Sequence, residues 1–339
     1  MAVTTEAGFA PAEEADMNDA IQETKPRYSN HPRLAVLCGG VGGARAARAL
    51  ASVLPAPHLT VIGNVGDDEV RYGVHVSADM DTIVYTLAGL QGPHGWGIAG
   101  DTFAVMDQLS VLGEDTTFRL GDQDLATCLH RTVRLGAGDS LSTTIAEGAA
   151  AFGVTVLVLP ATDDRLRTEI ITSDGERLAF QDYFVIRGHR DEVAGLDFVG
   201  SEAAVPAPGV VEAIEEADVV VIAPSNPPLS IWPILAVGDI AAAVDRHDRV
   251  VAISPLFGGA PIKGPADRVL ASLGFAPGNE GVAGAYAGLL SDLVIDVGDA
   301  ADIELLAAPQ LAVHALDTRM GGPNAGNRFA ASLLETLGW

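Results

Sequence analysis

Seven short runs of apolar, mostly β-branched residues recur along the chain. They cover residues 33–38, 58–63, 154–159, 218–223, 249–254, 292–297 and 310–315. Because these runs do not alternate apolar with polar positions, they predict strands that are covered on both faces, as in a parallel sheet. Helical patterns lie between them: residues 44–54 follow the first run and residues 266–275 follow the fifth. This alternation predicts a doubly wound α/β fold with a mainly parallel sheet.

Two excursions interrupt the alternation. Residues 64–152 separate the second and third runs, and four of their segments open with Asp, Thr or Ser and end at Gly, which predicts a mostly helical insert. Residues 166–187 predict a β-hairpin that turns at Asp174-Gly175. We therefore expect one α/β domain over residues 33–339, with a Rossmann-like sheet, preceded by a disordered acidic extension over residues 1–32.

The charge of the chain excludes two classes of partner. The 339 residues include 45 acidic and 20 basic side chains, a formal net charge of −25. Nucleic acids and anionic membranes bind basic patches, so we expect neither as a partner. The N-terminal residues lack the apolar run of a signal peptide, no run is long enough to cross a bilayer, and Cys38 and Cys128 lack the spacing of zinc ligands. These observations predict a cytoplasmic protein.

The first predicted strand ends in a glycine-rich turn, Gly39-Gly40-Val41-Gly42-Gly43. Its spacing misses the dinucleotide-binding fingerprint because Arg45 stands where a third small residue is required. Four glycines in five positions let backbone N–H groups converge on an anion at a helix N-terminus. A tight turn is the alternative, but one or two glycines would satisfy it. The excess glycine has no packing use that the sequence shows, which favours phosphate binding.

Acidic residues crowd the next loop. Asp67, Asp68 and Glu69 follow the second run, and Asp79 and Asp81 open the next helix. Carboxylates gathered at strand ends repel one another unless a cation joins them. Mg²⁺ prefers oxygen ligands, often one or two carboxylates together with substrate phosphates. In the alternative interpretation Asp79 and Asp81 cap the helix and the other three lie in a solvated turn.

Three further segments carry polar side chains at predicted strand ends or in the insert. Ser225 and Asn226 lie between prolines in a rigid loop after the fourth run, and Lys263 lies in a Gly- and Pro-rich loop after the fifth. Arg119 and Arg131 are either anion ligands or members of surface ion pairs. In so acidic a chain, an anionic substrate needs such local cations or a metal ion.

Eight motifs, in this order along the chain, resemble those of the 2-phospho-L-lactate transferase family of coenzyme F420 biosynthesis: GGVGGAR, GDDEVRYGVHVSADMDT, WGIAGDTF, RLGDQDLAT, PATDD, FQDYFV, APSNPPLSIWPI and SPLFGGAPIKGPA. The resemblance spans residues 33–320. It implies transfer of a phospholactyl or phosphoenolpyruvyl group from a guanosine-diphosphate-linked donor to the deazaflavin alcohol Fo. GMP leaves, a phosphodiester forms, Mg²⁺ is required, and the enzyme is a homodimer.

The resemblance also implies roles for individual residues. Asp67 and Asp79 are expected to bind Mg²⁺, and Asp81 and Arg119 to contact Fo. The expected catalytic residues are Asp67, Asp79 and Asp81, and for Asp81 our hypothesis is that it orients or deprotonates the attacking hydroxyl. The expected substrate-binding residues are Gly40, Gly42, Gly43, Asn64, Asp81, Arg119, Ser225, Asn226 and Lys263.

Two other hypotheses remain open from the sequence. A related gluconeogenesis-factor type of protein shares the glycine-rich opening and binds a nucleotide sugar as a regulator without catalysis. An NAD-dependent oxidoreductase is disfavoured by the failed fingerprint. Within the transferase hypothesis, the acid carried by the donor (lactyl, enolpyruvyl or glyceryl) stays open, because one methyl, methylene or hydroxyl needs only a small change of pocket.

Overall fold

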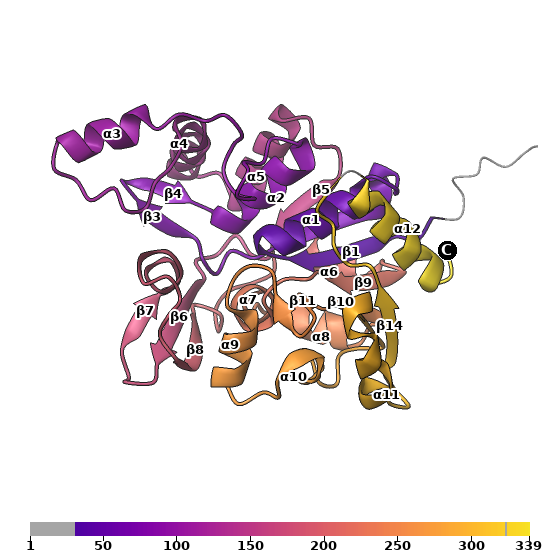
Figure 1. Ribbon diagram of the computed structural model, residues 1–339. Coiled ribbons are helices and arrows are strands. Elements are labelled where there is room, and N and C mark those ends of the chain that lie inside the picture. Colours follow the sequence, from indigo (N-terminus) through magenta and orange to yellow (C-terminus); the bar gives the residue numbers. More distant parts are fainter. Residues whose placement is uncertain (1–30, 323) are drawn as a thin grey trace, which may run out of the picture. The chain divides into compact units, whose positions relative to one another are not determined.

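A seven-stranded parallel sheet forms the centre of the fold (Figure 1). The structure is a computed structural model that describes residues 31–322 and 324–339. The predicted extension over residues 1–32 therefore lies outside the described residues, apart from its last two. His31–Trp339 forms one compact unit. No helix among the described residues has the length and apolar character needed to span a bilayer.

Each of the seven predicted runs contributes one strand to this sheet. The strand order is β14-β13-β10-β9-β1-β2-β5, and every adjacent pair is parallel. The strands are β1 (Leu34–Cys38), β2 (Leu59–Gly63), β5 (Leu157–Pro160), β9 (Val219–Ile222), β10 (Val250–Ile253), β13 (Asp292–Asp296) and β14 (Ala312–Leu316). The residues of β1, β9 and β10 are buried throughout, which confirms strands covered on both faces.

Helices cover both faces of the sheet, as Figure 1 shows. On one face α1 (Gly40–Ala51) packs against α2 (Ala78–Ala88) and α12 (Ala325–Thr336). The close approach of α1 to its neighbours follows from its small buried residues, among them Ala44, Ala46 and Ala47. On the other face α6 (Val210–Glu215) packs against α8 (Ile240–Asp245). The arrangement confirms the predicted doubly wound α/β fold.

The insert between β2 and β5 contains the four predicted helices. After α2 come α3 (Ala104–Val111), α4 (Asp122–Gly136) and α5 (Leu141–Ala151). The cap predicted for the last of them is present, since Ser140 Oγ accepts a hydrogen bond from the Thr143 amide. A short hairpin of β3 (Glu69–Arg71) and β4 (Val74–Val76), which the sequence analysis did not predict, precedes the helices.

The second excursion is a three-stranded antiparallel sheet of β6 (Arg167–Thr172), β7 (Arg177–Ala179) and β8 (Val193–Val199). The predicted turn at Asp174-Gly175 is confirmed, and Gly175 has the positive φ of +86° that this turn needs. The end of the predicted hairpin is wrong, because residues 182–186 form a π-helical turn. Phe180 and Phe184 stack at a ring distance of 5.4 Å, a contact that suits helical spacing rather than a strand.

The remaining elements lie in the connections between the strands of this sheet. They are η1 (Ala56–His58), η3 (Pro227–Ile231), α7 (Trp232–Leu235), β11 (Leu256–Phe257), β12 (Ala260–Pro261), α9 (Ala266–Ser272), α10 (Gly278–Ala285), η4 (Val297–Asp302) and α11 (Ile303–Leu306). From β1 the chain builds outward to β2 and β5, and it then returns to add β9 on the other side of β1. Strand order therefore reverses between β1 and β9, and the crevice outside the carboxyl ends of these strands is the expected ligand site.

Candidate functional site

The loops that follow β1 and β9 are joined at this reversal point. Ser225 Oγ accepts a hydrogen bond from the Gly39 amide (3.1 Å) and donates one to the Gly39 carbonyl (2.8 Å). Ser225 is buried. The predicted donor-binding loop therefore supports the glycine-rich turn directly. Asn226 Oδ1 accepts from the Leu229 amide, and its Nδ2 is buried without a partner among the described residues.

The glycine-rich turn differs from the prediction in one respect. Helix α1 begins at Gly40, so the glycines form its first turn. A Cβ on Gly42 would overlap the Pro224 carbonyl oxygen, and one on Gly43 would lie 2.5 Å from Ser225 Oγ. Gly42 and Gly43 are therefore required for close packing, and the expectation that the additional glycines have no packing use was wrong. The expectation of phosphate binding then depends on the remaining N–H groups of the first turn of α1, because the Gly39 amide donates to Ser225 and the Gly40 amide to Asp79.

Asp67 and Asp79 are brought together by Asn64. The Asn64 Nδ2 group donates to Asp79 Oδ2 (3.0 Å) and to Asp67 Oδ1 (3.3 Å), while its Oδ1 accepts from the Gly66 amide (2.8 Å). Asp79 Oδ1 also accepts from the Gly40 amide (2.7 Å), which ties this carboxylate to the start of α1. Asp67 and Asp79 are 4% and 7% exposed. We refer to these two side chains as the carboxylate pair.

Burial and mutual repulsion perturb the carboxylate pair. Burial, with the charges of Asp79 and Asp68, raises the pKa of Asp67 well above its usual range. Burial raises the pKa of Asp79 to about 6, although the bonds from Asn64 and Gly40 oppose this. No described residue forms an ion pair with either carboxylate. Two buried carboxylates that share one amide fit a hard divalent cation such as Mg²⁺.

The rest of the acidic cluster is satisfied by the protein. Asp68 accepts hydrogen bonds from Ser77 Oγ and from His75 Nε2, and Glu69 forms an ion pair with Arg71. Of the five crowded acids, the carboxylate pair thus has no ion-pair partner among the described residues, Asp68 and Glu69 stabilise the loop, and Asp81 remains to be placed.

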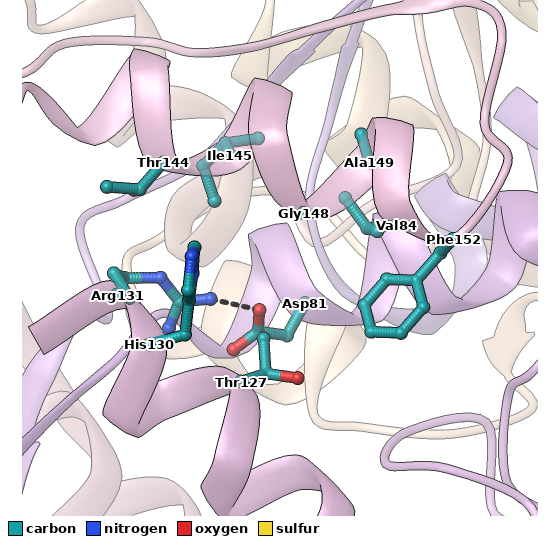
Figure 2. A pocket seen from close by; sticks show the side chains of 10 residues that line it. All are labelled: Asp81, Val84, Thr127, His130, Arg131, Thr144, Ile145, Gly148, Ala149 and Phe152. Atoms are coloured by element: carbon teal, nitrogen blue, oxygen red, sulfur yellow. Dashed lines mark hydrogen bonds and ion pairs between the residues drawn. The ribbon is translucent and has the colours of Figure 1, made fainter. Parts of the chain in front are cut away.

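Asp81 projects from α2 in another direction. Its carboxylate forms an ion pair with Arg131 of α4, and Arg131 Nη1 also donates to the His75 carbonyl (3.1 Å). This pair lines a cavity of about 20 Å³. Figure 2 shows residues of α5 on the side of the cavity across from the pair. The expectation that Arg131 is an anion ligand or a surface ion pair is wrong, because its side chain is 3% exposed and committed to Asp81.

Neither aspartate of the DMD motif is a helix cap. The N-cap residue of α2 is Ser77. The side chain of Asp79 binds Gly40 and Asn64, and that of Asp81 binds Arg131. The capping interpretation of these two residues is therefore wrong.

Lys263 and Arg119 lie on two different loops. Lys263 Nζ donates to the His94 carbonyl (2.9 Å) and lies 5.4 Å from the centre of the Trp96 ring. Gly95, between these two residues, packs against Val41 of the glycine-rich turn. Arg119 pairs with Asp107 at 2.6 Å and stacks over Phe103 in the insert. The structure thus connects Lys263 to the glycine-rich turn and shows no contact of Arg119 with the carboxylate pair.

Residues of the second excursion, which were not predicted as part of the candidate site, contact the loop that carries Asp67. The Thr168 amide donates to the Gly66 carbonyl (2.6 Å), and Gln181 Nε2 donates to the Asp67 carbonyl (3.4 Å). Arg167, next to Thr168, lies near the charges of Asp67 and its neighbours. Nothing in the local pattern of a hairpin indicates that its first strand closes a site formed after β2.

Comparisons with known proteins agree with the motifs. Residues 34–319 match the family described as 2-phospho-L-lactate transferase CofD. A phosphoenolpyruvate transferase of Streptomyces griseus subsp. griseus is 41% identical over 310 residues, covering 89% of this chain and 98% of the relative. A 2-phospho-L-lactate transferase of Methanopyrus kandleri is 37% identical over 310 residues, covering 90% and 97%. A UPF0052 family protein of Bacillus halodurans shares the fold, with a TM-score of 0.60 at 17% identity, covering 89% and 98%.

Proposed function

Because this chain belongs to the 2-phospho-L-lactate transferase CofD family and is a transferase of that type, we propose the following reaction for it. A phosphoenolpyruvyl or 2-phospho-L-lactyl group passes from a guanosine-diphosphate-linked donor to Fo, and GMP is released. The product is coenzyme F420-0 or its dehydro form. The observation that supports this proposal most directly is the carboxylate pair bound to Asn64 beside the N-terminus of α1.

The described residues suit the parts of this reaction. The N-terminus of α1 binds the donor diphosphate through the backbone N–H groups of the glycine-rich turn. Asp67 and Asp79 would hold Mg²⁺, which would make the attacked phosphorus more electrophilic and stabilise the charge on departing GMP. Asn64 keeps both carboxylates in place. A ribityl hydroxyl of Fo forms the new bond to phosphorus while the bond to GMP breaks, and positioning supplies much of the rate.

Asp81 enters this proposal in a changed role. A carboxylate that is buried and paired with Arg131 is poorly available to take a proton from a hydroxyl. We assign Asp81 to fixing α4 against α2, so that the insert keeps its position beside the carboxylate pair. The proton of the attacking Fo hydroxyl then passes to another group of the site or to water.

The experiment follows both products of the reaction. The purified protein is incubated with Fo, Mg²⁺ and each of the lactyl, enolpyruvyl and glyceryl donors, and GMP and the phosphodiester are detected by mass spectrometry. Asp67→Ala abolishes both products. Asp248→Ala is the matched control, because Asp248 is exposed and precedes the amino end of β10, whereas the candidate site lies at the carboxyl ends of the strands. If no donor yields GMP and a nucleotide sugar binds instead, the regulator hypothesis replaces this one.

We also propose that the enzyme is a homodimer. Exposed apolar side chains lie on α4: Val133 is 65% exposed and Leu129 48%. Leu129 and Val133 are four residues apart and share one helix face. These two side chains form the candidate contact surface, since contiguous exposed apolar residues mark interaction sites. Val133→Glu shifts the mass measured by light scattering to that of one chain, and an unchanged dimer mass rejects this surface.

A further inference from the structure

Arg167 differs from the other partly buried arginines near the site. Arg71 pairs with Glu69 and Asp182, and Arg131 pairs with Asp81. Arg167 is half-buried and forms no ion pair with any described residue. Its guanidinium makes one long hydrogen bond, 3.4 Å from Nη1 to the carbonyl of the preceding residue. In a chain with 45 acidic and 20 basic side chains, an arginine beside acids that binds none of them has its N–H donors available for a ligand.

The position of Arg167 is set by strand β6. The Thr168 amide donates to the Gly66 carbonyl, and Thr168 Oγ1 is buried beside Gly66 without a partner among the described residues. Burial lowers the pKa of Arg167, while the charges of Asp68, Glu69 and Asp67 raise it. The guanidinium therefore experiences the charges of these three acids, although it forms an ion pair with none of them.

A continuous row of contacts connects the glycine-rich turn to β6. The Gly40 amide binds Asp79, Asp79 and Asp67 share the Asn64 amide group, and the loop that holds Asp67 binds Thr168. The N-terminus of α1 and Thr168, the residue that follows Arg167, are thus the two ends of this row, with the carboxylate pair between them. In the proposed donor the groups follow a comparable order: the phosphate that leaves in GMP, the transferred phosphorus of the same diphosphate, and the carboxylate of the three-carbon acid at the far end.

We propose that Arg167 binds the carboxylate of the three-carbon acid carried by the donor. This inference rests on the proposed function, because that function supplies the acid-bearing donor. A guanidinium pairs with a carboxylate through two parallel N–H bonds, which suits recognition of a planar acid group. It also offsets the repulsion that an anionic donor meets from Asp67, Asp68 and Glu69.

The test compares two ligands that differ by the acid. Calorimetric titrations in the presence of Mg²⁺ give Kd for GDP and for guanosine diphosphate linked to lactate, with the wild type, Arg167→Gln and Arg167→Lys. We expect Arg167→Gln to weaken binding of the lactyl ligand by about 10- to 100-fold, the loss typical of a hydrogen bond to a charged group. Binding of GDP should weaken by less than about twofold. Arg167→Lys recovers part of the loss. Arg165→Gln, an exposed neighbour on the same segment, changes neither Kd.

Two outcomes overturn the proposal. If the substitution weakens binding of GDP and of the lactyl ligand equally, Arg167 acts on the diphosphate or through long-range electrostatics. If the Kd of the lactyl ligand is unchanged, Arg167 does not contact the acid. If Arg167→Gln fails to fold, Arg167→Lys decides by the same ratio of Kd values. The proposed function is judged separately by GMP release from the wild type, since donor binding without turnover rejects the reaction while the two Kd values still decide on Arg167.

Discussion

Replacing Asp81 by asparagine separates a structural role of this carboxylate from a catalytic one. The substitution keeps the size of the side chain and removes its charge. Arg131, which is 3% exposed, then keeps its bond to the His75 carbonyl but loses the only carboxylate with which it forms an ion pair among the described residues. Its Nε–H has no acceptor among those residues even in the wild type. The variant therefore contains a buried guanidinium without a counter-ion.

The size of the effect follows from this burial. Removing one partner of a buried ion pair costs about 3–5 kcal/mol. Unfolding entropy is about 2.1 cal/mol/K per residue, so a folded unit of roughly 300 residues loses about 1.5 °C of Tm per kcal/mol. We expect Tm to fall by roughly 5–8 °C. The lower end is favoured, because Asp124 lies near Asp81 and has its pKa raised to about 7, by burial first and then by the Asp81 charge. Once Asp81 is neutral, Asp124 ionises more readily and offsets part of the Arg131 charge.

The assay measures thermal unfolding and GMP release on the same preparations. The double variant Asp81→Leu with Arg131→Met removes both charges and should recover much of the Tm lost in Asp81→Asn. Turnover is measured well below the Tm of every variant, where all of them are folded. If Tm is unchanged in Asp81→Asn while turnover falls by about 100-fold or more, the size expected for loss of a general base, then Asp81 acts on the hydroxyl and our structural assignment is refuted.

Three further predictions concern the glycine-rich turn, the insert and the carboxylate pair. Gly42→Ala forces a Cβ against the Pro224 carbonyl and should cost about 1–3 kcal/mol in urea unfolding, whereas Gly136→Ala, where the added Cβ meets nothing, should not destabilise. Burial raises the pKa of Asp124 to about 7, so the folded protein keeps this proton to a higher pH than the unfolded chain does. The stability that Asp124 contributes is therefore present below about pH 4 and is lost as pH rises through 7. Asp124→Asn should abolish this loss of stability between pH 5 and 8. Asp79→Asn should raise the Mg²⁺ concentration needed for half-maximal GMP release, and an unchanged requirement would exclude Asp79 as a ligand.

The sheet could be predicted from the sequence because its strands are buried on both faces. Such strands appear as continuous apolar runs, and the seven runs became the seven strands of one parallel sheet. The order of strands then located the site, since β1 and β9 flank the reversal point. The segment at residues 182–186 could not be predicted in the same way. Its aromatic residues suit a strand by propensity, and only their packing in three dimensions favours the helical turn.

The carboxylate pair was predictable in its members but not in its geometry. Acids that follow β2 and open α2 must lie at one edge of the sheet, which is enough to nominate Asp67 and Asp79. The choice of Asn64 as their common partner depends on side-chain directions that no spacing records. The nomination of Arg167 requires knowledge that β6 pairs with the loop after β2, a contact between segments that are distant in sequence.

The DMD motif shows how a helix limits what a motif can do. Once its two aspartates are placed within α2, the helix turns by roughly 100° per residue, so their side chains project about 200° apart. Only one of them can then face the strand ends. Asp79 is that residue, because it binds the Gly40 amide at the start of α1. Asp81 must therefore face the other side of the helix, where a carboxylate needs a buried cation, and Arg131 of α4 supplies it. The two aspartates of one motif thus place the proposed ligand-binding carboxylate on one face of α2 and the ion pair with Arg131 on the other.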